Sequence, residues 1–136
     1  MKRVLIIPTG ILMMLYLASC TTGSSDVSSI PIDSTSIANG QVLFTQNCST
    51  CHNFKTDGIG PHLGGVTKTI STDWIKDFIK DPKTIIESKD ERAQGLFSKF
   101  KTVMPSFPQY TDGQIDELVA FIHTKKAPDP RKEFID

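Results

Sequence analysis

The chain has 136 residues, enough for one domain of ordinary size and a tail. Its 15 basic and 15 acidic residues cancel, and this balance does not favour a nucleic-acid-binding surface, which needs a basic excess. Hydrophobic residues make up 38% of the chain and can form a small core, while nine Gly and eight Pro indicate many loops. Three Cys are too few for a scaffold built on disulfides.

The N-terminus has the features of an export signal. Two basic residues precede an apolar stretch over residues 4–17, and small residues follow it. A membrane-spanning helix would need about 20 apolar residues, and this stretch is shorter and broken by Pro8 and Gly10. We therefore expect residues 1–19 to be a signal peptide; a buried N-terminal helix of the domain is the alternative.

The signal ends in Leu-Ala-Ser-Cys at residues 17–20. This tetrapeptide resembles the lipobox of bacterial lipoproteins, in which the cysteine is alkylated with diacylglycerol and becomes the new N-terminus. The resemblance implies that Cys20 is lipidated and that the exported protein is anchored to a membrane.

Residues 21–36 are expected to form a flexible tether. Nine of these sixteen residues are Ser or Thr, and almost none can be buried in a core. We expect the first helix of the domain to begin after Ser36 as N-cap and to run to about Cys48.

The motif Cys48-Ser49-Thr50-Cys51-His52 follows this helix. Two thiols at this spacing can each add across a vinyl group of one haem, and the adjacent histidine then serves as an axial ligand of the iron. Haem attachment of this kind takes place in exported chains. The motif therefore favours a covalently bound haem c.

Three other interpretations of the two cysteines remain open. A zinc site would need four ligands, and the remaining histidines, His62 and His123, form no second pair. A thiol-redox motif would normally lie in a βαβ pattern, which is absent from the sequence. A disulfide between Cys48 and Cys51 would close a very short loop and stabilise little.

The middle of the chain contains one clear helix pattern. Apolar residues from Trp74 to Ile79 recur on one side of a helix that should start near Ser71 or Thr72 and stop at Asp81-Pro82. Trp74 has two interpretations, a core residue or a donor to a haem propionate through its indole. Residues 90–100 suggest a helix interrupted by Gly95, and the segment 83–101 as a whole stays unassigned.

Met104 is the candidate sixth ligand of the iron. The other three methionines lie in the predicted signal peptide, so Met104 is the only one expected in the mature protein. A thioether is a soft, neutral ligand that raises the reduction potential of a haem. A core-filling methionine is the alternative, and His62 and His123 are the rival ligands.

The last helix is expected from Thr111 to Lys126, followed by a tail over residues 127–136. Thr111 and Gln114 have the spacing of a capping box, and apolar residues follow at helical intervals. No alternating strand pattern and no repeat occurs.

Three segments together resemble class I monohaem cytochromes c over residues 37–126: GQVLFTQNCSTCH, IGPHLG and MPSFPQYTDGQIDELVAFI. The resemblance implies an all-α fold of about four helices around one haem. It implies that the first and last helices cross at Gly40, against Leu118 or Phe121. It also implies that the Pro61 carbonyl accepts a hydrogen bond from His52, the ligand that Met104 opposes.

The implied function is one-electron transfer by a membrane-tethered protein on the periplasmic side of a membrane or at the cell surface. Expected partners are redox proteins such as membrane-bound oxidases, reductases or quinol-oxidising complexes, and no nucleic acid. The alternatives are a haem enzyme or gas-binding protein with an open sixth site, an electron-entry subunit of a larger oxidoreductase, and a lipoprotein without haem.

Overall fold

The computed structural model describes residues 30–129. Within that range the chain forms only helices: α1 (Ser34–Asn47), η1 (Val66–Lys68, a 3-10 turn), α2 (Thr72–Lys80), α3 (Pro82–Glu87), α4 (Glu91–Phe100) and α5 (Asp112–His123). The predicted all-α class is confirmed. The predicted signal peptide, Cys20, residues 21–29 of the tether and residues 130–136 of the tail lie outside the described residues. No helix between residues 30 and 129 is long and apolar enough to cross a membrane.

The start of α1 differs from the prediction, because Asp33 and not Ser36 is the N-cap. One carboxylate oxygen of Asp33 accepts hydrogen bonds from the backbone N–H groups of Thr35 and Ser36, each at 3.0 Å. The Ser36 hydroxyl donates to the other oxygen at 2.6 Å. These bonds satisfy donors that a helix start otherwise leaves unpaired. Residues 34–36, expected in the tether, are therefore helical.

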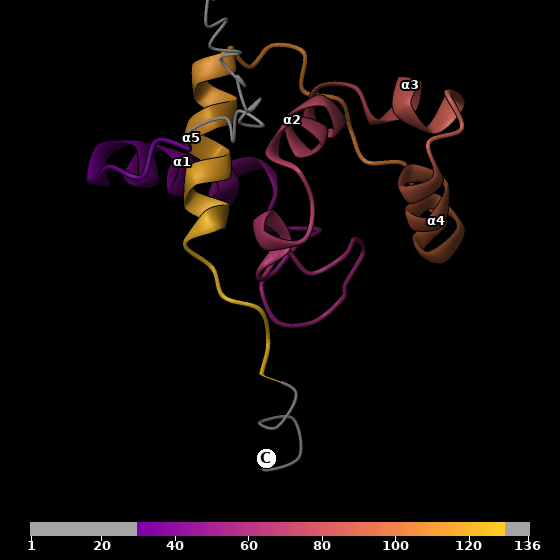
Figure 1. The fold of residues 1–136 in the computed structure, drawn as a ribbon, viewed down its shortest axis with the longest axis horizontal. Coiled ribbons are helices and arrows are strands. Elements are labelled where there is room, and N and C mark those ends of the chain that lie inside the picture. Colours follow the sequence, from indigo (N-terminus) through magenta and orange to yellow (C-terminus); the bar gives the residue numbers. More distant parts are fainter. Residues whose placement is uncertain (1–29, 130–136) are drawn as a thin grey trace, which may run out of the picture.

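Helices α1 and α5 cross one another (Figure 1), and their contact is the largest between elements of the described chain. At Gly40 the two backbones meet so closely that an added Cβ would lie 1.9 Å from the carbonyl oxygen of Glu117 and 2.9 Å from the Cβ of Phe121. The predicted crossing at Gly40 is confirmed, with Phe121 and the Glu117 backbone as neighbours, whereas Leu118 is not among the nearest atoms. Helix α5 alone contributes most of the buried core: Ile115, Leu118, Val119, Ala120, Phe121 and Ile122.

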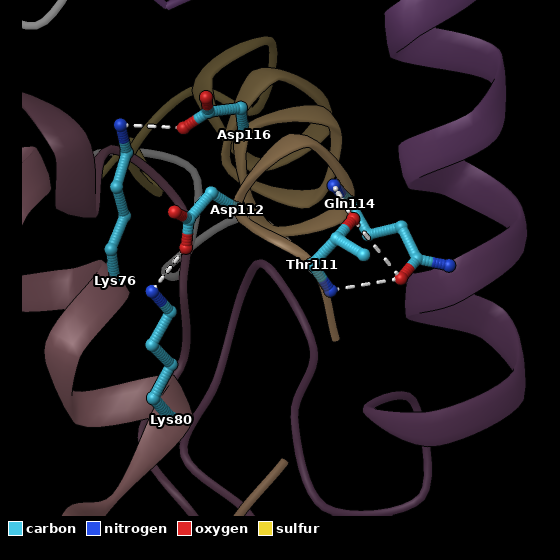
Figure 2. A network of polar contacts seen from close by, with 6 residues as sticks. All are labelled: Lys76, Lys80, Thr111, Asp112, Gln114 and Asp116. Carbon is cyan, nitrogen blue, oxygen red and sulfur yellow. Dashed lines mark hydrogen bonds and ion pairs between the residues drawn. The ribbon is translucent and has the colours of Figure 1, made fainter. Parts of the chain in front are cut away.

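Helix α2 lies against α5 and begins where the sequence predicts, with Ser71 as N-cap. Figure 2 shows two parallel ion pairs between the helices, Lys76 with Asp116 at 2.5 Å and Lys80 with Asp112. The two lysines and the two aspartates are each four residues apart, so each pair of like residues occupies one helix face. The ion pairs fix the register of α2 along α5.

The predicted capping box at the start of α5 is confirmed. The Thr111 hydroxyl accepts from the Gln114 backbone N–H at 3.2 Å, and the Gln114 side chain accepts from the Thr111 backbone N–H at 3.0 Å (Figure 2). The helix ends at His123, earlier than the predicted end at Lys126. The chain leaves the helix here because the Lys125 carbonyl accepts a hydrogen bond from Gly65 at 2.9 Å.

The unassigned segment forms the helices α3 and α4, which Figure 1 places on the side of α2 away from the crossing of α1 and α5. Pro82 opens α3, a position that needs no backbone N–H. Helix α4 runs through Gly95, contrary to the predicted interruption. Capping by Asp90, which accepts from Ala93 N–H at 2.8 Å, helps to offset the helix penalty of glycine, about 1 kcal/mol.

Candidate haem site

The motif at residues 48–52 lies in a tight turn at the end of α1. Cys48 is the C-cap of α1, and its carbonyl accepts hydrogen bonds from the backbone N–H groups of Cys51 at 3.1 Å and His52 at 2.9 Å. The Gly60 N–H donates to the Cys51 carbonyl at 3.0 Å, so the following loop folds back over the motif. The turn presents both thiols and the imidazole within a few residues of one helix end.

His52 is oriented by the loop that returns beside it. Its Nδ1 lies 2.8 Å from the Pro61 carbonyl oxygen, which is the hydrogen bond that the resemblance to class I cytochromes c implies. Such a bond fixes the ring and directs Nε2 away from the loop. At Gly60 an added Cβ would lie 2.4 Å from the His52 Cε1, so only glycine lets the loop pass this close to the ring.

One cavity of about 280 Å³ joins the candidate residues. Six of the predicted site residues line it: Cys48, Cys51, His52, Pro61, Trp74 and Met104. The seventh, Cys20, lies outside the described residues. The cavity thus brings together four segments that are far apart in sequence: the motif after α1, the loop before η1, helix α2 and the segment after α4.

The cavity suits a haem by the chemistry of its walls. Apolar side chains from α2, α3, α4, α5 and the loops cover most of its surface: Ile59, Leu63, Val66, Ile70, Ile75, Phe78, Ile79, Ile86, Leu96, Phe97, Phe100, Val103, Phe107, Leu118 and Ile122. Two of the lining residues carry a buried nitrogen atom without a hydrogen-bond partner in the protein, His62 Nδ1 and Trp74 Nε1. Two thiols, an imidazole and a thioether around an apolar cavity match what a covalently held haem requires.

Two of the other interpretations of the cysteines find no support. Among residues 30–129 no three His, Cys, Asp or Glu side chains gather as a metal ion would need, which disfavours zinc. Burial, and secondarily the neighbouring Cys51, raises the pKa of the Cys48 thiol to about 11. Thiol-redox motifs instead lower the pKa of their attacking cysteine.

Met104 lies in the extended segment between α4 and α5, half-buried and packed against the core. The segment is attached to α2, because the Phe107 N–H donates to the Ile79 carbonyl at 3.2 Å. Met104 therefore both contacts the core and lines the cavity, a position that is compatible with a core-filling residue and with an iron ligand.

The two rival histidines differ in position. His123 does not line the cavity, and its Nδ1 lies 2.9 Å from the Thr67 hydroxyl. His62 does line the cavity. The carbonyl of its neighbour Pro61 accepts a hydrogen bond from His52, so the backbone before His62 lies beside the His52 ring.

Trp74 packs as its core interpretation predicts, and it also lines the cavity. Its ring stacks on Phe78 with centroids 4.7 Å apart and packs against the core. The Arg92 guanidinium of α4 lies 5.7 Å from the ring centroid. The indole Nε1 is buried and has no hydrogen-bond partner in the protein.

The sequence reasoning missed the part that α3 and α4 play in the site. Ile86, Leu96, Phe97 and Phe100 complete the cavity wall. The spacing of Leu96 and Phe100, one helical turn apart, was the available signal.

An ion pair joins helix α4 to the loop that follows the motif at residues 48–52. Lys99 Nζ lies 2.6 Å from one carboxylate oxygen of Asp57, and the other oxygen accepts from the His62 backbone N–H at 3.0 Å. The hydrogen bond from Lys99, and then that from His62, lowers the pKa of Asp57.

Comparison with known proteins agrees with this site. The sequence matches the family described as Cytochrome c over residues 37–126, the range over which the sequence resembles class I cytochromes c. The chain belongs to the cytochrome c family, whose members transfer electrons through one covalently attached haem c. The predicted cofactor is thereby confirmed. A search of curated protein sequences finds no match.

Solved structures support the fold. A cytochrome c from Rhodothermus marinus aligns with a TM-score of 0.64 and 24% identity, covering 68% of this chain and 78% of that one. An engineered cytochrome c from the same organism, bound to a carbene intermediate, aligns with a TM-score of 0.62 and 23% identity over 71% and 81% of the two chains. At these identities the likeness shows the fold alone.

Proposed function

We propose that this cytochrome c is an electron carrier in which Cys48 and Cys51 hold the haem covalently and His52 and Met104 bind its iron. The observation that carries the proposal is that all four side chains, from two segments far apart in the sequence, line one apolar cavity. Bound there, the haem supplies one-electron chemistry by alternating between ferric and ferrous iron.

Each residue has a separate task. The Pro61 carbonyl keeps the proton on His52 Nδ1, which leaves Nε2 as the ligand atom and makes the imidazole a stronger donor. Met104 would bind the iron through its thioether sulfur, a ligand that would raise the reduction potential. The apolar walls exclude water, which favours the less charged ferrous state.

A haem enzyme or gas-binding protein is the competing function, and it requires an open sixth position. An absorption spectrum of the holoprotein separates the two. With Met104 bound, the oxidised protein should show the sulfur-to-iron charge-transfer band, and the reduced protein should bind carbon monoxide poorly. Met104→Ala should lose the band and bind carbon monoxide readily. Avid binding of carbon monoxide by the unmodified protein would instead support the competing function.

We propose further that Cys20 carries a lipid and anchors the exported protein to a membrane. The tetrapeptide at residues 17–20 behind an export signal supports this. Cys20→Ser should release the protein from membranes without changing its haem spectrum. If the substituted protein still sediments with membranes after a high-salt wash, the anchor lies elsewhere.

The proposed partners are membrane-bound redox complexes, namely oxidases, reductases or quinol-oxidising complexes. The large apolar side chains of Ile59, Phe97 and Val103 are exposed by 54%, 39% and 46%, and all three line the cavity. They therefore surround its opening, where an apolar rim suits brief contact with another redox protein.

A further inference from the structure

Met104 lies in a segment whose own backbone does not hold it in place. Residues 102–106, here called the methionine segment, belong to no helix. None of their backbone groups takes part in a hydrogen bond within the described chain. The segment nevertheless keeps the thioether of Met104 at one place on the cavity wall. Its position therefore depends on the anchors at its two ends.

The downstream anchor is a hydrogen bond to helix α2. The Phe107 N–H donates to the Ile79 carbonyl at 3.2 Å. The Tyr110 ring stacks on the Phe107 ring with centroids 5.4 Å apart, and both residues pack against the buried core. The chain is thus fixed to α2 immediately after the methionine segment.

The upstream anchor is the ion pair near the end of α4. Lys99 Nζ lies 2.6 Å from one carboxylate oxygen of Asp57. The other oxygen accepts from the His62 backbone N–H at 3.0 Å, which fixes Asp57 to its own loop. The chain is thus fixed a second time, three residues before the methionine segment begins.

This ion pair joins two walls of the cavity. In α4, Phe97 and Phe100 line the cavity before and after Lys99 in sequence. In the loop that follows the motif at residues 48–52, Ile59 lines it two residues after Asp57. The pair therefore holds the end of α4 to the loop whose later residues orient His52.

The start of α4 is fixed by different contacts. The Gln94 side chain donates to the Ile86 carbonyl of α3 at 2.6 Å, and Ala93 is fully buried. The Arg92 guanidinium lies 5.7 Å from the centroid of the Trp74 ring on α2. Loss of the ion pair should therefore release the end of α4 that leads to the methionine segment while the start of the helix stays in place.

The junction between α4 and the methionine segment is sterically strained. Lys101, which follows the helix, has a φ of 54°. This left-handed conformation is unfavourable for a residue with a side chain, and it persists where surrounding contacts enforce it. The ion pair of Lys99, two residues earlier, is such a contact. It therefore also helps to set the direction in which the chain leaves α4.

We propose that Lys99 and Asp57 are positioning residues for Met104: their ion pair is the upstream anchor of the methionine segment and controls how readily Met104 leaves the iron. The proposal rests on the proposed function, in which Met104 binds the iron, and deepens it by naming what holds that ligand in place. The two side chains are 65% and 35% exposed, and exposed ion pairs stabilise weakly. We therefore expect an effect of about two- to five-fold on a rate and no loss of the ligand.

Imidazole binding to the oxidised holoprotein measures this effect. Imidazole can take the sixth position only after the thioether has left, so the rate at saturating imidazole reports the departure of Met104. This limiting rate should rise about two- to five-fold in Lys99→Met and in Asp57→Asn. Asparagine removes the charge but keeps an oxygen atom that can accept from the His62 N–H. The double variant should be no faster than the faster single variant, because all three remove the same contact.

Two further variants serve as controls. Lys99→Arg keeps a cation opposite Asp57 and should retain the limiting rate of the unmodified chain. Lys83→Met removes the cation of the exposed pair with Glu87 on α3 and should leave the rate unchanged. An equal rise in Lys99→Met and Lys83→Met would overturn the proposal, since the rate would then respond to net charge alone.

Amide hydrogen exchange provides a measurement that does not involve the iron ligand. In the Lys99→Met holoprotein the amides at the C-terminal end of α4 should exchange faster, whereas those of α5 should keep their rates. Unchanged exchange at the end of α4 would show that other contacts hold this end, and would refute the proposal.

The outcomes separate this inference from the function on which it rests. If the unmodified chain shows the sulfur-to-iron band and has the same limiting rate as Lys99→Met, the ion pair has no positioning role and the electron carrier stands. If the unmodified chain lacks that band, Met104 is not the ligand, and the proposed function fails together with the role given to the ion pair.

Discussion

His52 owes its orientation to two residues that contribute no side-chain chemistry of their own. Gly60 allows the loop to approach the ring, and the Pro61 carbonyl accepts the proton on Nδ1. The proposed Met104 ligand, in contrast, acts through its own sulfur atom. Single substitutions around His52 and at Met104 should therefore have different spectroscopic consequences.

Met104→His should keep the iron six-coordinate but lower its reduction potential, because imidazole donates electron density more strongly than a thioether. Potentiometric titration and the absorption spectrum measure the two effects. The sulfur-to-iron band should vanish while carbon monoxide binding stays poor, unlike in Met104→Ala. A Met104→His protein with the potential and the sulfur band of the unmodified chain would show that Met104 is not the ligand.

Lys99→Met should raise the pKa of Asp57 towards its ordinary value of 3.8, since Lys99 is the main cause of the lowering. A carboxyl with a lowered pKa stabilises the fold above its unfolded pKa and loses that contribution as the pH falls through its folded pKa. The unmodified chain should therefore be the more stable one at neutral pH, with a difference that shrinks as the pH falls from about 3.8 through the lower pKa of Asp57 in the folded chain. Carboxyl chemical shifts and thermal unfolding against pH measure both effects.

The matched control is Lys83→Met on α3. Lys83 faces Glu87 at 3.7 Å, and the two side chains are 73% and 65% exposed. Removing this charge should leave the pKa of Asp57 unchanged. An equal change in both variants would mean that the Asp57 pKa responds to net charge and not to the Lys99 contact.

Among the elements, the crossing of α1 and α5 contributes most to the core. It depends on Gly40 for close approach, while the aromatic rings of Phe44, Phe54 and Phe121 pack beside it with centroids 4.7–5.8 Å apart. Helices α3 and α4 have a different role, because they close the cavity and add only Ala93 and Pro82 to the buried set.

Gly40→Ala and Gly95→Ala form a matched pair of substitutions within helices. The first would place a Cβ 1.9 Å from a backbone carbonyl and should destabilise the fold by about 3 kcal/mol or more. The second meets nothing within 4 Å and should stabilise α4 by about 0.5–1 kcal/mol. Denaturant unfolding of both holoproteins measures these changes. Equal effects at the two positions would contradict the close approach at Gly40.

On the scale of the whole molecule, a lysine lies close to the exposed apolar residues at the cavity opening. Lys101 follows α4 directly, two residues before the exposed Val103. The charge of the nearby Lys99 is paired with Asp57. We therefore expect Lys101 to contribute more than Lys99 to the potential that an approaching partner meets.

Lys101→Glu should slow electron exchange with the anionic probe hexacyanoferrate several-fold at low ionic strength. The difference should fade as salt is added, because exposed charges are screened over about 8–10 Å near physiological ionic strength. Stopped-flow kinetics measure the rate. Lys126→Glu makes the same charge change after α5, where neither sequence neighbour lines the cavity, whereas Thr102 beside Lys101 does line it. The effect of Lys126→Glu should therefore be smaller. Equal slowing by both variants would show that only net charge matters.

The sequence by itself determines the features whose physics is local. The spacing of Cys48, Cys51 and His52 predicts the haem, capping residues predict the starts of α2 and α5, and apolar periodicity predicts their buried faces. Such features depend on residues within about one helical turn. Where two local signals compete, as at Asp33 and Ser36, the side chain that completes more hydrogen bonds decided the helix start.

Tertiary structure decided whatever depends on contacts between distant segments. That α4 runs through Gly95 and closes the cavity follows from the Lys99–Asp57 pair and from Leu96 and Phe100 on the cavity wall. The early end of α5 follows from the hydrogen bond between Gly65 and Lys125. The unpaired Nδ1 of His62 likewise becomes visible only once the cavity exists, because burial is a property of the packed chain and not of a residue's neighbours in sequence.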